Sequence, residues 1–323
     1  MATVTKLKAQ VDNINLPILG SDGKLYSYYY GRYFNVITEK GYTPTSGEKA
    51  ALEAFIQNGI DNGWIDLVKY FLPLIGSADH LGAATVPLID RVGDYAMAEY
   101  DGTENFSNSF EVVGGKVKYY TRIDTPASII KTPCAVASMS GGISFSGYIP
   151  QPEVVNTSFN DQYAGIKLDG QNITLLQIRY HEGTNGVVKN HQIGYLPQSS
   201  SESNTFYDIN IPSKATIEEL NAQGMSMMLS IALYKDNGTV KRLRSYQDAN
   251  GVKNYTNTTP DTPFTYDDYS LNQGKMVFGE PRYLAVPSQK FGCLGVLDAP
   301  KFTDTLANSY NDAVFTLMAA LGK

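Results

Sequence analysis

The sequence predicts a mainly β protein: an antiparallel β-sandwich with a broken helix near the N-terminal end and a single helix at the C-terminal end. Between these two helical segments, short apolar or alternating runs are separated by turns rich in Gly, Asn, Asp and Pro, which is typical of antiparallel strands. Only residues 45–76 and 302–321 carry strong apolar patterns at helical spacing.

Residues 1–24 are predicted to form an arm, and residues 25–323 the sandwich domain. Leu16-Pro17 and the turn at 20–23 end any short helix within the arm. We expect the arm to serve attachment or oligomerisation, while a disordered terminus would explain the same composition.

The segment Leu25–Ile37 (LYSYYYGRYFNVI) is predicted to be the first strand, because Tyr and Phe favour strands. Aromatic residues fall on both faces of such a strand, which predicts burial on both sides or a partner surface.

The broken helix is predicted to begin at Thr45, where Thr45-x-x-Glu48 matches a capping box. Leu52, Phe55 and Ile56 share one helical face. After the interruption at residues 59–63, a second set of helical turns is predicted to end before Pro73; it consists of Trp64, Leu67, Val68 and Phe71. The apolar face of this segment must pack on the sandwich.

The remaining strands are predicted at 110–113, 116–123, 142–149, 164–168, 173–180, 187–195, 205–211, 227–234, 240–246, 275–279, 281–286 and 291–297, with a short helix near 216–224. The strands at 110–113 and 116–123 are predicted to form a hairpin with its turn at Gly114-Gly115. The clearest hairpin turns at Asn237-Gly238, since this pair supplies the positive φ of a tight turn. Residues 247–274 are predicted to be a long loop. The final helix, Phe302–Leu321, has its apolar stripe at spacings of four and three residues, and Gly322 is expected to cap it.

Composition argues against several classes of function. The net charge is −6 and the pI about 5.2, which disfavours nucleic-acid binding because phosphate contacts need a basic surface. No stretch is long and apolar enough for a membrane span, and no secretory signal is visible. Cys134 and Cys293 are predicted to be buried free thiols, since two distant cysteines do not imply a disulfide framework.

Two end motifs are similar to a pattern found in structural proteins of tailed bacteriophages that carry a concanavalin A/laminin-G-like β-sandwich, or jelly roll. The first motif, within residues 55–76, contains Gly59-Ile60, Gly63-Trp64-Ile65-Asp66 and Leu72-Pro73-Leu74-Ile75-Gly76. The second, within residues 297–323, contains Phe302-Thr303-Asp304, Tyr310-Asn311-Asp312-Ala313-Val314 and Ala320-Leu321-Gly322-Lys323. The resemblance spans residues 30–323, but the middle of the chain does not match it strand by strand.

This resemblance implies a virion component, such as a fibre, tail or capsid-surface protein, made in the cytoplasm of the host bacterium. Such a component would act by assembly and surface binding. We expect it to contact other virion proteins through the N-terminal arm and to form a homo-oligomer, for example a trimer. A glycan- or receptor-binding adhesion module is the alternative, with a host-surface glycan as its ligand. A glycoside hydrolase is the third hypothesis.

No catalytic residue, metal site or cofactor is predicted. We identify no Glu-x-Asp-x-(x)-Glu run of the kind that sandwich glycosidases place on one strand, and we therefore predict no glycosidase site. His181 and His191 could meet across a hairpin, but ordinary hairpin residues explain them without a metal. Turn residues Asp236, Asn237, Asp248 and Asn250 offer calcium oxygens, and turn chemistry explains them equally well.

Three tyrosines in and beside the long loop, Tyr255, Tyr266 and Tyr269, are predicted to form an exposed ligand-binding rim. Packing of this loop against a neighbouring subunit is the alternative. We therefore expect a non-enzymatic protein whose loops adhere or assemble.

Overall fold

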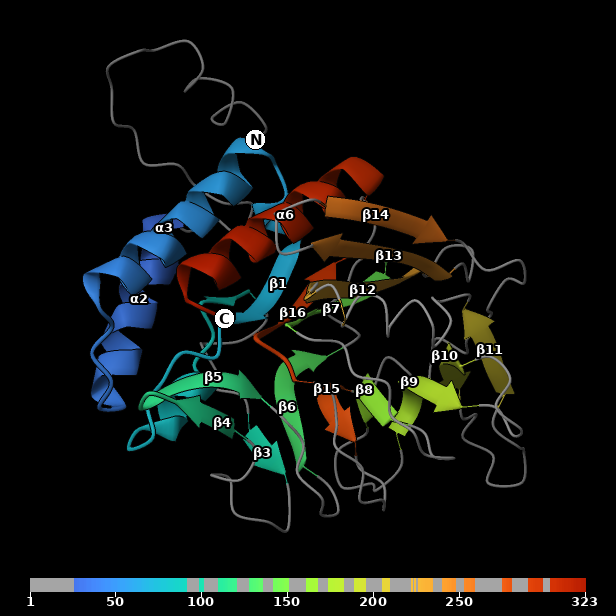
Figure 1. The fold of residues 1–323 in the computed structure, drawn as a ribbon, viewed down its shortest axis with the longest axis horizontal. Helices are drawn as coiled ribbons and strands as arrows, with labels where there is room; N and C mark the ends of the chain where they lie inside the picture. The colour runs from blue at the N-terminus through green and yellow to red at the C-terminus, as the bar shows by residue number, and fades with distance from the viewer. Residues whose placement is uncertain are drawn as a thin grey trace.

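A computed structural model gives the fold of the chain (Figure 1). The structure describes residues 26–91, 99–101, 110–120, 128–135, 142–150, 161–167, 174–182, 189–195, 205–209, 222, 224, 226–234, 240–247, 253–258, 275–280, 290–298 and 303–323. The predicted arm at 1–24 lies outside these residues, so its role stays a prediction.

Two seven-stranded sheets form the body, and every paired strand in them is antiparallel. The first sheet has the order β14-β13-β12-β7-β16-β1-β2, with bounds Lys253–Thr258, Val240–Gln247, Ser226–Tyr234, Gly142–Ile149, Cys293–Asp298, Val68–Leu72 and Ile89–Asp90. The second has the order β11-β10-β9-β8-β15-β6-β3, with bounds Thr205–Ile209, Lys189–Tyr195, Thr174–Glu182, Asp161–Lys167, Lys275–Glu280, Ser128–Ala135 and Glu99–Asp101. A separate hairpin pairs β4 (Phe110–Val113) with β5 (Lys116–Tyr120).

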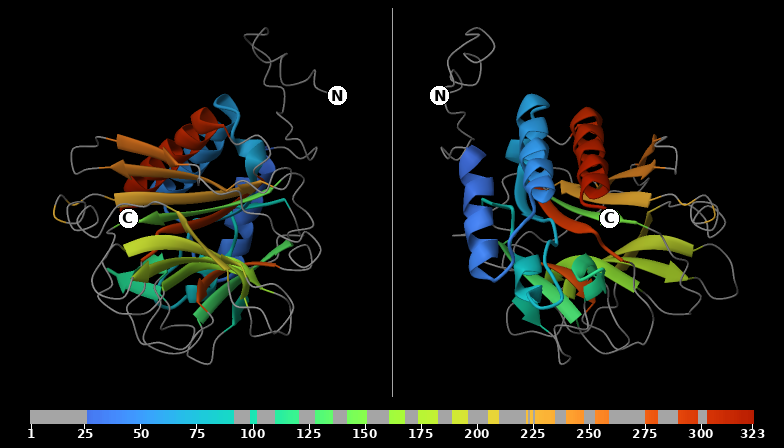
Figure 2. Two further views of the ribbon diagram at one scale, coloured as in Figure 1. Left: turned by 90° about the vertical axis from the view of Figure 1, so that its right-hand side faces the viewer. Right: turned by 60° about the vertical axis from the view of Figure 1, so that its left-hand side comes forward.

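Three helices pack on one side of this body: α2 (Tyr26–Glu39), α3 (Ser46–Asp61) and α6 (Asp304–Ala320). Short 3₁₀ turns occur at η2 (Ile65–Leu67) and η3 (Leu81–Thr85). Figures 1 and 2 show α3 and α6 over the first sheet, with the second sheet on the opposite side of it. The molecule therefore has three layers: helices, first sheet and second sheet.

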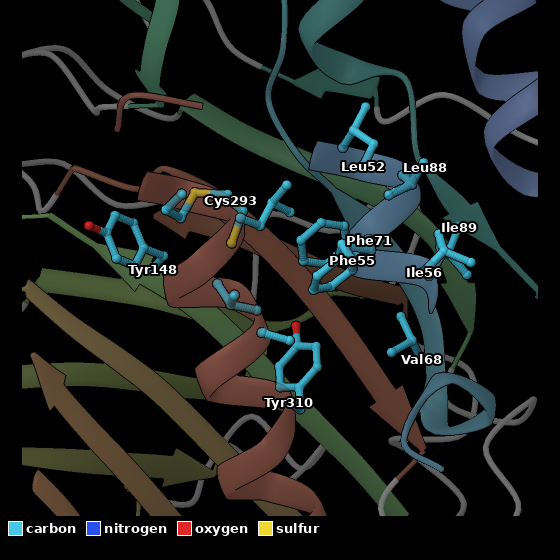
Figure 3. Packing of buried hydrophobic residues seen from close by; sticks show 14 of the residues in the cluster. Leu52, Phe55, Ile56, Val68, Phe71, Leu88, Ile89, Tyr148, Cys293 and Tyr310 are labelled. Carbon is cyan, nitrogen blue, oxygen red and sulfur yellow. The ribbon is translucent and has the colours of Figure 1, made fainter. Parts of the chain in front are cut away.

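The first sheet is buried on both faces where it is described in full. Every residue of β16 is buried. Phe71 and Cys293 belong to the core beneath the helices, whereas Tyr70 and Leu294 are buried on the other face. Figure 3 shows Phe55 of α3 against Phe71 of β1, and their ring centroids are 4.7 Å apart. A strand buried on both faces needs apolar residues throughout, which explains the sequence Cys293–Leu297.

The predicted strand at 25–37 is wrong, because this segment forms helix α2. Tyr29, Tyr33 and Ile37 lie four residues apart and are fully buried, as one stripe of a helix. Arg91 stacks on the Tyr29 ring, with 5.0 Å from the guanidinium carbon to the ring centroid. Burial of this stripe outweighs the weak preference of tyrosine for strands.

The second half of the predicted broken helix is also wrong. Helix α3 ends at Asp61, and after the η2 turn the chain continues as strand β1, between β16 and β2. A short apolar run fits a buried strand and a buried helical turn equally well by spacing alone. Residues 68–72 form a strand because β16 and β2 pair with both of its edges.

Several local predictions are confirmed. Thr45 and Glu48 form the capping box of α3. Gly114 and Gly115 have φ of 59° and 78°, as the tight turn between β4 and β5 requires. The strands predicted at 142–149, 227–234 and 240–246 are β7, β12 and β13 within one residue. Helix α6 buries Tyr310, Val314 and Leu317, and Gly322 follows it at φ 68°.

Besides β1, four strands are additional to the prediction: β2, β3, β6 and β14. Strand β14 lies inside the segment predicted to be a long loop. Strand β6 contains Pro133, whose missing N–H disfavours a strand interior, and the register with β15 shifts at that point. The predicted strand at 281–286 and most of the predicted helix at 216–224 lie outside the described residues.

Candidate binding face

The two end motifs come together in space and form one packed unit. Trp64 is fully buried, with its ring centroid 4.9 Å from that of Phe55 and 5.3 Å from that of Tyr310. Its indole N–H donates to Asn58 Oδ1 at 3.1 Å. The Tyr310 hydroxyl lies 2.8 Å from Ser146 Oγ of β7. These motif residues therefore join α3 and α6 to the first sheet.

Lys323 ties the end of the second motif to the first. Its ammonium donates to the carbonyl oxygens of Pro73, Leu74 and Gly292 at 2.8, 2.9 and 2.9 Å. Burial lowers the pKa of this ammonium to about 7. Leu74 has φ of 54°, a costly conformation for a residue with a side chain. The Lys323 ammonium therefore satisfies these three converging carbonyl oxygens, which gives it a structural role.

Cys293 is a buried free thiol, as predicted, and burial raises its pKa to about 12. A thiol that stays protonated is a poor nucleophile. The side chain of Cys134 lies outside the described residues.

A partly buried ionic cluster joins the β4–β5 hairpin to α3. Glu48 Oε1 accepts from Lys116 Nζ at 2.7 Å and from the Tyr42 hydroxyl at 2.8 Å, and its Oε2 accepts from the Thr45 amide at 2.8 Å. Burial acts to raise the pKa of this carboxyl, but the hydrogen bonds from Lys116, Thr45 and Tyr42 lower it overall. The cluster satisfies its own charges, which marks it as structural.

The second sheet separates its residues cleanly into two faces. Ile130 and Thr132 of β6 are buried, so their register row belongs to the face toward the sandwich interior. That row crosses all seven strands as Tyr100, Ile130, Phe278, Ala164, Ile178, Ile193 and Tyr207. We call the opposite face the outer face.

A row of hydrogen-bonding residues crosses four strands on the outer face. Gln162, Arg179, Gln192 and Asp208 occupy directly opposite register positions on β8, β9, β10 and β11. Neighbouring strands lie about 4.8 Å apart, so the row spans roughly 14 Å. His181 and Asn190 are paired two residues further along the same face. This row of the outer face is therefore polar, whereas the neighbouring inner row of Ala164, Ile178, Ile193 and Tyr207 is largely apolar.

All three glycines in the described strands of the second sheet fall on the outer face. Gly165 and Gly194 pair with the same residue, Gln177 of β9, from its two sides, and Gly279 lies on β15. Glycine within a strand weakens it, and it commonly marks a place where a ligand approaches the backbone closely. The outer face thus combines polar residues with glycines.

Only one of the predicted rim residues, Tyr255, belongs to the described part of the chain, and it is not part of this face. Tyr255 lies in β14, opposite Ser245 at the edge of the first sheet. Tyr266 and Tyr269 lie outside the described residues, so the rim stays a prediction. The two histidines do not oppose each other across the hairpin: His181 pairs with Asn190 and His191 with Tyr180, which places them on opposite faces. This register agrees with the interpretation of both as ordinary hairpin residues. The calcium candidates at 236–237 and 248–250 also lie outside the described residues.

Sequence reasoning missed two features of the second sheet. The alternation of polar and apolar residues in 174–182 and 189–195 was visible, but the adjacency of the two rows depends on register. The second feature corrects a prediction: the sequence does contain a Glu-x-Asp-x-x-Glu run, Glu99-x-Asp101-x-x-Glu104, which begins on the unpredicted strand β3. Glu99 and Asp101 share the outer face, opposite Lys131 and Ile129 of β6.

The described residues contain neither a membrane-spanning helix nor a metal-binding cluster. No helix among them is long and apolar enough to cross a membrane. No group of three or more His, Cys, Asp or Glu within the same part of the chain is placed to hold a metal ion.

No protein-family model matches the sequence, and no curated protein matches it. Several solved structures are similar to part of this chain, at low identity and with low TM-scores. A tailspike protein from the Escherichia coli O157:H7 bacteriophage CAB120 is 10% identical over 60% of this chain, with a TM-score of 0.36. The match spans only 24% of the length of the tailspike.

An alginate lyase from Pseudomonas aeruginosa is 13% identical over 55% of this chain and 80% of its own, with a TM-score of 0.31. Peanut lectin is 10% identical over 58% of this chain and 88% of its own, with a TM-score of 0.30. These similarities are too weak to transfer a function to this chain.

Proposed function

We propose that this protein is a structural component of a tailed-phage virion that binds carbohydrate through the outer face of its second sheet, on a sandwich of the concanavalin-like kind. The observation that carries the proposal is the row of Gln162, Arg179, Gln192 and Asp208, next to strand glycines at 165 and 194.

The chemistry of this row suits a sugar. Saccharide hydroxyls both donate and accept hydrogen bonds. Gln side chains offer both roles, Arg offers five donors and Asp offers acceptors. The glycines remove side chains beside Gln177, so a flat ring could lie close to the sheet. We expect this row to bind sugar without cleaving it, because three of its four residues carry amides or a guanidinium, which form hydrogen bonds but do not serve as nucleophile or base.

The virion assignment is supported by the end motifs. Residues similar to the phage pattern at both ends of the sequence pack on one another through Trp64, Tyr310 and Lys323. The packed unit covers the first sheet and leaves binding to other parts of the molecule. We further propose that residues 1–24 attach the protein to other virion proteins and that it assembles as a homo-oligomer.

Mass spectrometry of purified particles tests the virion assignment. The protein is expected among the stoichiometric components of the particle, and electron microscopy should place it on the surface. Its absence from particles would contradict the assignment. Light scattering of the purified protein tests the oligomer, and a strictly monomeric mass would contradict that part.

A glycan array tests the binding role. The intact protein is expected to bind a defined set of glycans, and the Arg179→Ala and Gln192→Ala variants should lose that binding. Asn35→Ala on the exposed surface of α2 is the matched control and should bind as the parent protein does. Equal binding by all four proteins would show that the outer face is not the site.

A glycoside hydrolase is the second candidate, and the acidic run favours it. Glu99 and Asp101 share the outer face of β3 at alternate positions, and paired carboxylates are the usual machinery of glycosidases. Release of reducing sugar from a host polysaccharide, abolished by Glu99→Gln and Asp101→Asn, would support this candidate. We expect no release, because β3 is the edge strand and lies at the opposite end of the sheet from the polar row.

A further inference from the structure

Positive charge is concentrated on the central strands of the outer face. The outer positions of β15, β8, β9 and β10 carry Lys275, Lys167 and Arg179, and no acidic residue falls among them. Acidic outer positions occur only on the edge strands of the described sheet, at Glu99 and Asp101 on β3 and Asp208 on β11. This band stands out in a chain whose net charge is −6.

Two of the basic residues oppose each other directly. Lys275 of β15 and Lys167 of β8 occupy the same register position on the outer face. Like charges at directly opposite positions destabilise a sheet. Lys131, one row away, faces Glu99 across β6 and β3 and so has an opposite charge in register. The Lys167–Lys275 pair has no acidic residue opposite it in the neighbouring register positions, which are Ala135 and Thr174.

From this placement we infer that the outer face takes an anionic polysaccharide, whose carboxylate or sulfate groups are matched by the basic residues at the register positions of Lys167, Lys275 and Arg179. The inference rests on the proposed carbohydrate-binding function and names its ligand class. An anion between two lysines converts their repulsion into attraction, and Arg binds a carboxylate through two parallel hydrogen bonds.

The arrangement favours a polysaccharide over a nucleic acid. Phosphate binding usually uses a broad basic surface, whereas this band is narrow, is bordered by acidic edge strands and is interrupted by Gly165 and Gly194. A polymer with one charge per sugar ring fits the spacing of separate cations. The amides of Gln162 and Gln192 would then serve its hydroxyls.

The test is calorimetric titration of the purified full chain with polygalacturonate, with neutral dextran and with single-stranded DNA. We expect polygalacturonate to bind, dextran to bind much more weakly, and DNA not to bind. Affinity for polygalacturonate should fall as salt is raised, because exposed charges are screened. The Lys167→Gln/Lys275→Gln double variant should lose at least tenfold in affinity, while Lys40→Gln on the exposed end of α2 should change it less than twofold.

A second readout separates a binding role from a structural one. Without ligand, Lys275→Gln should raise the melting temperature slightly, because it removes a like-charge pair, even though it weakens binding. A variant that both loses binding and melts earlier would count against the inference.

The outcomes are distinguishable. Dextran binding equal to polygalacturonate binding would overturn the anionic ligand class but leave the proposed carbohydrate function intact. Polygalacturonate binding that the lysine variants do not weaken would overturn the site. Binding of DNA in place of polysaccharide, or binding of none of the three polymers, would overturn the inference, whereas the proposed carbohydrate function is decided separately by the glycan array.

Discussion

Replacing Gly59 with alanine tests whether the first end motif is a packing motif. In an exposed helix interior, Gly→Ala stabilises by about 1 kcal/mol because alanine has the higher helix propensity. Here an added Cβ would lie 2.9 Å from Cβ of Ile65 and 2.9 Å from two atoms of the Trp64 ring. Ordinary carbon contacts are roughly 3.5–4.0 Å, so these neighbours would have to move by more than half an ångström.

Neither neighbour has room to move, since Trp64 is fully buried and Ile65 nearly so. Overpacking of this kind costs about 1–3 kcal/mol. After the propensity gain is subtracted, we expect Gly59→Ala to lower the free energy of unfolding by up to about 2 kcal/mol.

Gly47→Ala in the first turn of the same helix is the matched control. The nearest atom to its added Cβ is Thr45 Oγ1 at 4.0 Å, so only the propensity gain applies. Urea unfolding followed by circular dichroism should show opposite signs for the two variants. If Gly59→Ala stabilises the protein as much as Gly47→Ala does, the close approach between α3 and the Trp64 ring is wrong.

Three further predictions concern the packing of the helices and the hairpin. Tyr310→Phe and Ser146→Ala should each destabilise by about 1–2 kcal/mol, because each leaves a buried hydroxyl without its partner, whereas the double variant should cost clearly less than their sum; strictly additive unfolding energies would argue against this hydrogen bond. Lys323→Met should cost about 2–4 kcal/mol by leaving three carbonyls unsatisfied, and an unchanged urea midpoint would refute that role. The lowered pKa of Glu48 means that its carboxylate stabilises the fold above its ordinary pKa of 4.5 and that this contribution disappears as the pH falls further. The Glu48→Gln variant should therefore show a weaker loss of stability between pH 5 and pH 3 than the parent protein, and parallel curves would contradict the assignment.

Helix caps and tight turns could be predicted from the sequence, because they depend on interactions between residues close together in the chain. The Thr45–Glu48 box, the Gly114-Gly115 turn and the Gly322 cap all depend on residues within four positions of one another. These elements could be placed from the sequence because no distant partner decides them.

The wrong predictions concern segments whose secondary structure depends on residues far away in the sequence. The stripe of Tyr29, Tyr33 and Ile37 was hidden among other aromatic residues, and only the surface it packs on distinguishes helix from strand. Residues 68–72 became a strand because β16 and β2 pair with both of its edges. Periodicity carries no information about such pairing.

The candidate face could be predicted only in fragments. Each strand shows its own alternation, but Gly165 and Gly194 become neighbours of Gln177 only through the order β8-β9-β10. Lys167 and Lys275 are far apart in sequence and meet through one register. The tyrosine-rich loop was predicted to bind ligand because its composition is unusual. The polar row consists of ordinary residues that only the strand register brings to adjacent positions.

Hydrogen–deuterium exchange of the intact protein, with and without a saturating bound polysaccharide, tests the central claim most directly. The account predicts slower amide exchange in β8, β9, β10 and β15 on binding, with exchange in α3 and α6 unchanged. Protection confined to the helices or to the edge of the first sheet around Tyr255 would contradict it, because the ligand would then lie on a different face of the molecule.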